Sequence, residues 1–146
     1  MPNVLITRNI PQPALDRIRA ACTVRQWESD DPMPRAALLE WAQGVDGIFC
    51  LLTERVDAEL VEAAGPQLKV ISTMSVGYDH VDAAALRARG VLLGNTPGVL
   101  TEDTADMTMA LILAAPRRIV DGVSAMQSGQ FVGWSPTWML GRRIYG

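Results

Sequence analysis

Few residues of this sequence are of the kinds that form disulfides, metal centres or nucleic-acid surfaces. Two cysteines and one histidine occur among 146 residues, and Cys22 and Cys50 stand in separate apolar contexts without a CxxC motif or a Cys/His metal spacing. We therefore expect no metal site, and a reduced, cytoplasmic setting is the default. Thirteen basic and sixteen acidic residues give a net charge of -3 without a basic stripe, so nucleic acid is not an expected partner.

Long apolar segments and glycine-rich phosphate loops are also missing. The longest apolar run, Met107 to Ala115, is much shorter than the roughly 20 residues of a membrane-spanning helix. The amino terminus has no charged region followed by an apolar stretch, so neither a signal peptide nor a membrane partner is expected. No GxGxxG motif occurs, and the glycines from Gly141 to Gly146 lack its spacing. These residues therefore contain no dinucleotide phosphate loop of that kind.

The sequence does contain a regular alternation of short β-rich runs and helical patterns, which is typical of parallel βαβ units. The predicted strands are Val4–Thr7, Thr23–Gln26, Gly47–Leu52, Lys69–Met74 and Val91–Gly94. The predicted helices are one opened by Pro11 and Pro13, Arg35–Gln43, Ala58–Ala64 capped by Asp57, and one capped by Asp82 that runs to Arg89. We expect an α/β fold, a flavodoxin-like doubly wound sheet of five parallel strands from about Asn3 to Pro97.

The pattern changes at Thr101. One long helical pattern, interrupted near Pro116, runs to about Ser128, and an extended arm without periodicity follows from Gly129 to Gly146. The part from Met107 to Ala115 is apolar on nearly all sides of the predicted helix, so most of its surface must be buried. The rest of a nucleotide-binding domain, a second subunit or both could cover it. We therefore divide the chain into residues 1–98 and residues 99–146.

The loops after the strands are where a parallel sheet binds ligands, because helix amino termini and free N–H groups gather there. Ser75, Val76 and Gly77 follow the fourth predicted strand. Gly77 allows close backbone approach, and successive amides can face an anion. Spacing alone favours the simpler interpretation, a strand-to-helix turn in which Gly77 only relieves steric crowding.

Two longer segments carry a resemblance that shifts this balance. LKVISTMSVGYDHVD (residues 68–82) and GNTPGVLTEDTADMTMALILAAPRR (residues 94–118) resemble the NAD(P)-dependent D-2-hydroxyacid dehydrogenases, and within them the glyoxylate/hydroxypyruvate reductase branch. The resemblance implies that the amides of Val76 and Gly77 hold the substrate carboxylate and that Leu52 lines the same cleft. It also places Thr104 near the nicotinamide end of the cofactor, NADPH or NADH.

The resemblance covers the whole chain but only about half of a typical family member. It implies that residues 1–98 are the substrate-binding domain and that residues 99–146 begin the nucleotide-binding domain. The family's catalytic arginine, glutamate and histidine are expected downstream of Gly146, so no catalytic residue is assigned within this chain. His80 precedes a helix and lacks an orienting carboxylate, Asp79 is better explained as a turn residue, and Asp106 as a support of the hinge.

The arm contains an aromatic cluster of Phe131, Trp134 and Trp138. Large aromatic side chains contribute most when they are buried against a partner, so this cluster predicts an interface. The resemblance implies a homodimer through the Met107–Ala115 helix and the Phe131–Trp138 arm, with Trp134 closing the neighbouring subunit's substrate pocket. Trp138 is expected to be structural.

Three functions remain open. The first is the amino-terminal part of a glyoxylate or hydroxypyruvate reductase that works by hydride transfer, with this chain alone inactive because the phosphate loop and the catalytic set are missing. The second is a non-catalytic regulatory module of the same superfamily that senses a dinucleotide. The third, a free-standing flavodoxin-like binding domain, leaves the apolar helix and the Trp134 arm unexplained.

Overall fold

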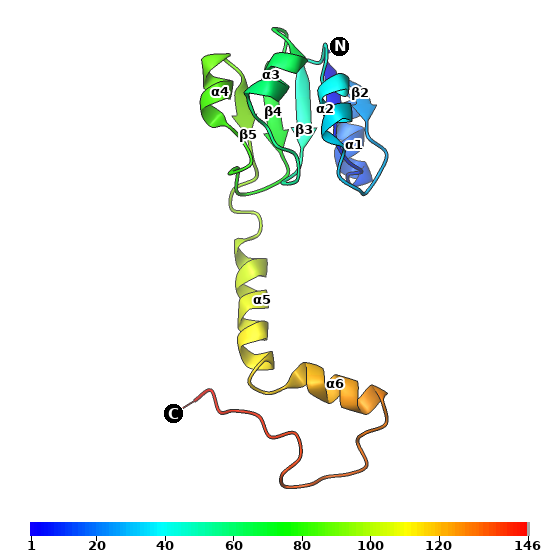
Figure 1. The fold of residues 1–146 in the computed structure, drawn as a ribbon, viewed down its shortest axis with the longest axis vertical. Coiled ribbons are helices and arrows are strands. Elements are labelled where there is room, and N and C mark those ends of the chain that lie inside the picture. The colour runs from blue at the N-terminus through cyan, green and yellow to red at the C-terminus, as the bar shows by residue number, and fades with distance from the viewer. Residues whose placement is uncertain (146) are drawn as a thin grey trace. The chain divides into compact units, whose positions relative to one another are not determined.

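The computed structural model describes residues 1–145 of the chain (Figure 1). The chain separates into two compact units, Met1–Gly98 and Val99–Gly146. Within residues 1–145, no helix has both the length and the apolar character needed to cross a membrane.

The first unit is a doubly wound α/β domain built on five parallel strands, which confirms the predicted fold class. The strands are β1 (Asn3–Ile6), β2 (Thr23–Gln26), β3 (Gly47–Cys50), β4 (Val70–Thr73) and β5 (Leu92–Gly94). Their order across the sheet is β2-β1-β3-β4-β5, and every pairing is parallel. In such a sheet the strand order reverses beside β1, and the loops that follow the strands share one edge.

Four helices connect these strands. They are α1 (Gln12–Arg19), α2 (Arg35–Trp41), α3 (Ala58–Ala64) and α4 (Ala83–Ala88). The predicted caps are confirmed, because the carboxylate of Asp57 accepts a hydrogen bond from the Leu60 N–H and that of Asp82 accepts from the N–H groups of Ala84 and Ala85.

Several elements are one to two residues shorter than predicted, and for β3 the reason is visible. The prediction extended this strand to Leu52, but it ends at Cys50. The Leu51 N–H donates to the Glu54 carboxylate at 2.7 Å instead of continuing the strand ladder. A side-chain acceptor three residues ahead therefore ends the strand, which an apolar run in the sequence does not reveal.

The core of the first unit lies between the sheet and the row of helices α2, α3 and α4. Strand residues Leu5, Ile48 and Ile71 are buried there together with Leu38 and Leu60 of the helices. Neighbouring strand residues face opposite sides of a sheet, and Ile6 of β1 is buried outside this cluster. Both faces of the sheet therefore bury apolar side chains, as expected for a parallel sheet.

The second unit consists of α5 (Thr101–Ala114), α6 (Ile119–Gln127) and an arm without helix or strand. The two helices are separated around Pro116, and Arg118 adopts a left-handed backbone conformation there, with φ of 56°. The Arg142 N–H donates to the Pro116 carbonyl at 2.8 Å, so the arm returns to this turn. No residue of α5 is buried in the described chain.

Candidate functional site

The loop after β4 holds its backbone in an unusual way, because three consecutive carbonyl groups are occupied by donors from the chain. The Ser75 carbonyl accepts from the Thr96 N–H at 2.9 Å. The Val76 carbonyl accepts from Nδ2 of Asn95 at 2.8 Å, and the Gly77 carbonyl accepts from Oγ of Ser75 at 2.7 Å. The loop is thus tied to the segment that follows β5 and to its own serine.

These carbonyl contacts determine where the amides of Val76 and Gly77 are directed. In a planar trans peptide the N–H of one residue points away from the carbonyl of the preceding residue. The carbonyls of Ser75 and Val76 both face the Asn95–Thr96 segment, so the N–H groups of Val76 and Gly77 both face away from it. Within residues 1–145 these two N–H groups have no acceptor. Adjacent free amides on one side of a loop form an anion-binding arrangement.

Gly77 has open space around its missing side chain. A Cβ atom built there would meet only the Oδ2 atom of Asp79, at 3.9 Å, which is ordinary van der Waals contact. Gly77 also lies outside the positive-φ region that favours glycine. The structure therefore gives no internal steric reason for a glycine at this position, and the space beside Gly77 is open to close approach by another group.

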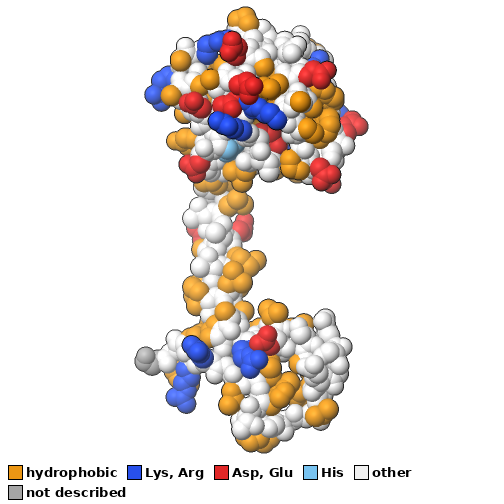
Figure 2. Space-filling view, viewed as in Figure 1, with side chains coloured by type: hydrophobic (Ala, Val, Ile, Leu, Met, Phe, Trp, Pro, Cys, Tyr) orange, Lys and Arg blue, Asp and Glu red, His pale blue; other side chains and the backbone are white. Residues whose placement is uncertain are grey.

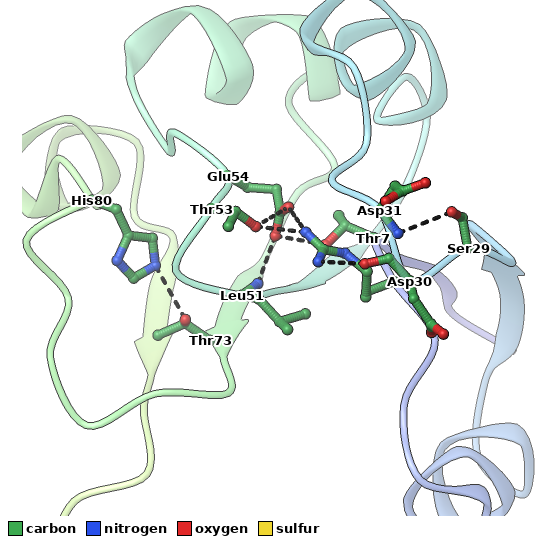
Figure 3. Close-up of polar contacts among 10 residues, drawn as sticks. Thr7, Ser29, Asp30, Asp31, Leu51, Thr53, Glu54, Thr73 and His80 are labelled. Atoms are coloured by element: carbon green, nitrogen blue, oxygen red, sulfur yellow. Dashed lines mark hydrogen bonds and ion pairs between the residues drawn. The ribbon is translucent and has the colours of Figure 1, made fainter. Parts of the chain in front are cut away.

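A chain of hydroxyl groups supports the loop from below. Oγ1 of Thr73, at the end of β4, lies 2.8 Å from Oγ of Ser75. The same Thr73 oxygen lies 3.1 Å from Nε2 of His80 (Figure 3). Thr73 and Ser75 are both buried. The only histidine thus hydrogen-bonds to a buried threonine beneath the loop. This contact favours a structural role for His80.

The loop after β3 is organised by the buried carboxylate of Glu54, which the sequence analysis did not single out. Its two oxygens accept hydrogen bonds from Oγ1 of Thr7 at 2.9 Å, the guanidinium of Arg8 at 3.1 Å, the Leu51 N–H at 2.7 Å and Oγ1 of Thr53 at 2.7 Å (Figure 3). The side chain of Glu54 is only 1% exposed and that of Arg8 12%. A buried carboxylate needs such hydrogen-bond partners because burial removes its hydration by water.

This Glu54 cluster joins the ends of two neighbouring strands, because Thr7 and Arg8 follow β1 while Thr53 and Glu54 follow β3. Leu52 stands on the same loop and is 62% exposed. The loops that carry Leu52 and Val76 follow adjacent strands and share one edge of the sheet. A sequence signal for the cluster existed, since Arg8 and Glu54 are charged residues in the short loops that follow the apolar strands β1 and β3.

Cys50 lies beside the Glu54 cluster but has no nucleophilic character. Burial raises the pKa of its thiol to about 12, and the negative charge of Glu54 acts in the same direction. A reactive cysteine needs a lowered pKa, so this thiol stays protonated at neutral pH. Within residues 1–145, no group of three or more histidine, cysteine or acidic side chains is placed to hold a metal ion.

The remaining predicted site residues lie in the second unit and are described within it. Thr104 is exposed in the first turn of α5, which begins at Thr101, and the N-cap residue Leu100 makes no side-chain cap hydrogen bond. Trp134 is 85% exposed. The rings of Phe131 and Trp138 lie against each other with their centroids 5.3 Å apart.

Comparisons with known proteins agree with this arrangement of elements. The sequence model of the family described as "D-isomer specific 2-hydroxyacid dehydrogenase, catalytic domain" matches residues 4–137. The chain is 44% identical over 135 residues to a glyoxylate reductase/hydroxypyruvate reductase of Mus musculus, covering 90% of this chain and 41% of that protein. It is 44% identical over 147 residues to a glyoxylate reductase of Thermofilum pendens, covering 99% and 43%.

A crystal structure of a protein from Thermus thermophilus has 43% sequence identity and a TM-score of 0.91, covering 99% of this chain and 46% of that one. The chain thus spans less than half the length of each of these proteins. The family match nevertheless covers most of the chain, and the fold agrees with it. The chain belongs to the D-isomer specific 2-hydroxyacid dehydrogenase family.

Proposed function

We propose that residues 1–98 form the substrate-binding domain of an NAD(P)H-dependent 2-keto acid reductase and that residues 99–146 begin its nucleotide-binding and dimerisation part. The observation that carries this proposal is the pair of outward-facing amides at Val76 and Gly77. Glyoxylate or hydroxypyruvate is the proposed substrate, since the similar mouse protein is named a glyoxylate reductase/hydroxypyruvate reductase and the similar Thermofilum protein a glyoxylate reductase.

The residues of this chain would bind and orient the substrate. The amides of Val76 and Gly77 donate to its carboxylate, and two donors on one anion fix both its position and its direction. Leu52 then borders the rest of the acid with an apolar side chain, which suits small substrates. In this arrangement the chain selects a carboxylate with a short substituent and holds its keto carbon in a defined place.

The dinucleotide is bound mainly by residues outside this chain. Of the residues here, only Thr104 is proposed to lie near the nicotinamide, and the sequence contains no GxGxxG loop for the phosphates. When bound, the reduced nicotinamide supplies the hydride for the keto carbon. We therefore expect these 146 residues alone to bind NADPH or NADH weakly and to have no reductase activity.

Exposed apolar surface in the second unit supports a homodimer as part of this proposal. Within α5, Met107, Leu111 and Ile112 are each more than half exposed, and Trp134 is exposed in the arm. Soluble monomers rarely expose apolar patches of this kind, and two-fold dimers are the commonest closed assembly. We propose that α5 and the Phe131–Trp138 arm form this interface and that Trp134 limits the substrate size of the neighbouring subunit.

The test uses the complete protein that contains this chain. Its oxidation of NADPH and NADH is followed with glyoxylate and hydroxypyruvate, and the variant Gly77→Val is compared with the parent. A Cβ at position 77 enters the space where the carboxylate binds, so KM for the keto acid should rise strongly while cofactor affinity stays nearly unchanged. Unchanged kinetics in Gly77→Val would reduce this loop to a turn.

The regulatory module remains the alternative, and the same experiment separates it from the enzyme. A complete protein that binds a dinucleotide tightly but oxidises none with either keto acid would favour the module. The free amides alone do not distinguish the two, because a sensor also has use for an anion site. Turnover is therefore the deciding measurement.

A further inference from the structure

Asn95 connects the segment after β5 to the loop after β4 through a single side-chain contact. Its Nδ2 atom donates to the Val76 carbonyl at 2.8 Å, and the neighbouring Thr96 N–H donates to the Ser75 carbonyl at 2.9 Å. Two adjacent donors on one segment therefore hold two adjacent carbonyls of the other. The first donor depends on the identity of a side chain, whereas the second is backbone and persists in any Thr96 variant other than proline.

The peptide between Val76 and Gly77 needs such a restraint. Its orientation is set by the ψ angle of Val76 and the φ angle of Gly77, and glycine tolerates almost any φ. Rotating this peptide by half a turn would direct the Val76 carbonyl, instead of the Gly77 N–H, at a bound anion. A carbonyl oxygen facing a carboxylate is repulsive, so binding requires that the rotated form stay unpopulated.

We propose that Asn95 is a positioning residue that holds the Val76–Gly77 peptide in the orientation whose N–H binds the substrate carboxylate. This inference rests on the proposed function and deepens it. Asn95 touches no substrate in this role; it acts by occupying the Val76 carbonyl with a donor. Asn95 lies in the segment that follows β5 and precedes the second unit in the sequence. Its hydrogen bond therefore links this segment to the loop after β4 that carries Val76 and Gly77.

Asn95→Asp is the sharpest test, because it keeps the shape of the side chain and replaces the Nδ2 donor with an acceptor. In the complete protein, KM for glyoxylate should rise by about tenfold or more, which corresponds to losing one charge-assisted hydrogen bond to the carboxylate. The kcat at saturating glyoxylate and the affinity for NADPH should change by less than about threefold. Asn95→Ala should raise KM less, because it removes the donor without adding repulsion.

Thr96→Ala is the matched control. It changes the neighbouring side chain but leaves the Thr96 N–H donor to Ser75, so KM should stay within about twofold of the parent protein. Backbone amide signals give a second readout in the 146-residue chain. With added oxamate, the Val76 and Gly77 signals should shift in the parent and in Thr96→Ala, and should shift much less in Asn95→Asp.

The outcomes separate this inference from the proposed function. A parent protein without keto-acid turnover and without oxamate shifts at Val76 and Gly77 overturns both. Turnover in the parent together with an unchanged KM in Asn95→Asp overturns only the role of Asn95. A rise in KM accompanied by comparable losses of NADPH affinity and thermal stability in Asn95→Asp would mean that Asn95 is a general structural residue, which also overturns the proposal.

Discussion

The two units of the chain differ in how far they bury their apolar side chains. In the first unit Leu5, Leu60 and Ile71 are completely buried. In the second unit α5 buries no residue, and its apolar side chains are exposed along its length (Figure 2). Ala125 of α6 is the only apolar residue of that unit among the buried core residues described.

This difference shows that apolar composition predicts burial but not the partner that provides it. The first unit packs α2, α3 and α4 on its sheet and has a core of its own, although Val70 of β4 and Leu92 of β5 stay exposed. The second unit exposes the apolar side chains of α5, whereas a helix that is apolar on most sides is usually buried. Contacts with other protein, such as those of the proposed dimer, are the explanation that we propose for this exposed surface.

The largest difference in stability between the two units is expected when a buried and an exposed helical leucine are each replaced by alanine. Leu60 of α3 is fully buried, whereas Leu111 of α5 is 60% exposed. Leu60→Ala should lower the free energy of unfolding by about 2–5 kcal/mol, because it leaves a cavity in a packed core. Leu111→Ala should change it by less than about 0.5 kcal/mol in the monomer. Urea unfolding of the 146-residue chain measures both.

Protein concentration provides the control for this pair. If the chain associates through α5, Leu111→Ala should weaken the association, and the difference between the two variants should be largest at low concentration, where the monomer dominates. Similar losses for Leu60→Ala and Leu111→Ala at every concentration would show that α5 is packed within the monomer, and the contrast between the units would not hold.

The fold of the first unit was predictable because its signals are local. The strands β1, β3 and β5 contain short apolar runs, and Asp57 and Asp82 mark helix starts that the structure confirms. The strand ends were less predictable, because the end of β3 depends on the carboxylate of Glu54 reaching back to the Leu51 N–H. A side chain that competes with the strand ladder leaves no periodic signal.

The candidate site was predictable only in part. Val76 and Gly77 were indicated by the resemblance and by glycine in a loop after a strand. The donors that orient them come from Asn95 and Thr96, about twenty positions further along, and are brought close by the pairing of β4 with β5. Likewise, the contact of Arg8 with Glu54 depends on β1 pairing with β3. Long-range contacts of this kind follow from topology, which the local pattern does not contain.

The next effect in size concerns the Glu54 cluster, which has no counterpart in the exposed second unit. Glu54→Gln keeps the size of the side chain but removes the negative charge and places an amide against donors from Thr7, Thr53 and Arg8. The free energy of unfolding should fall by about 1–3 kcal/mol, because the amide keeps one acceptor oxygen and the donors to the other carboxylate oxygen lose their acceptor. Thermal unfolding measures this loss.

Glu102→Gln in α5 is the matched control for this change, since it makes the same substitution at an exposed position. It should alter stability by less than about 0.5 kcal/mol. An equally small effect of Glu54→Gln would mean that the cluster is not needed to hold the loop after β3.

A smaller effect is expected from the ion pair of Arg35 with Asp57 in the first unit. Partial burial raises the pKa of Asp57, but hydrogen bonds from Arg35 and the Leu60 N–H, with the nearby positive charges, outweigh it and leave the pKa below its ordinary value. This stabilisation is fully present above the unfolded pKa of about 3.9 and is lost as the pH falls through the lower folded value.

Arg35→Gln should therefore lower the free energy of unfolding at pH 7, measured by urea unfolding. The loss should be less than about 1 kcal/mol, because the ion pair is partly exposed. The difference from the parent should shrink as the pH falls below about 4. Lys69 lies 3.9 Å from Asp46 and is far more exposed, so Lys69→Gln should have a smaller effect. A difference between Arg35→Gln and the parent that persists unchanged at low pH would show that packing, not charge, explains it.

The smallest effect on stability is expected at Trp134, which is an exposed residue of the second unit and also has a role in the proposed function. Its side chain is 85% exposed, so Trp134→Ala should change the unfolding free energy of the 146-residue chain by less than about 0.5 kcal/mol. In the complete protein the same variant should keep the dimer, as sedimentation would show, and should raise relative activity on bulkier keto acids more than it lowers activity on glyoxylate.

Phe131→Ala is the control, because Phe131 packs on Trp138 and should affect the arm without changing the substrate profile. A monomer at micromolar concentration would remove the basis for a role across subunits, and an unchanged profile in Trp134→Ala would leave this tryptophan with packing alone.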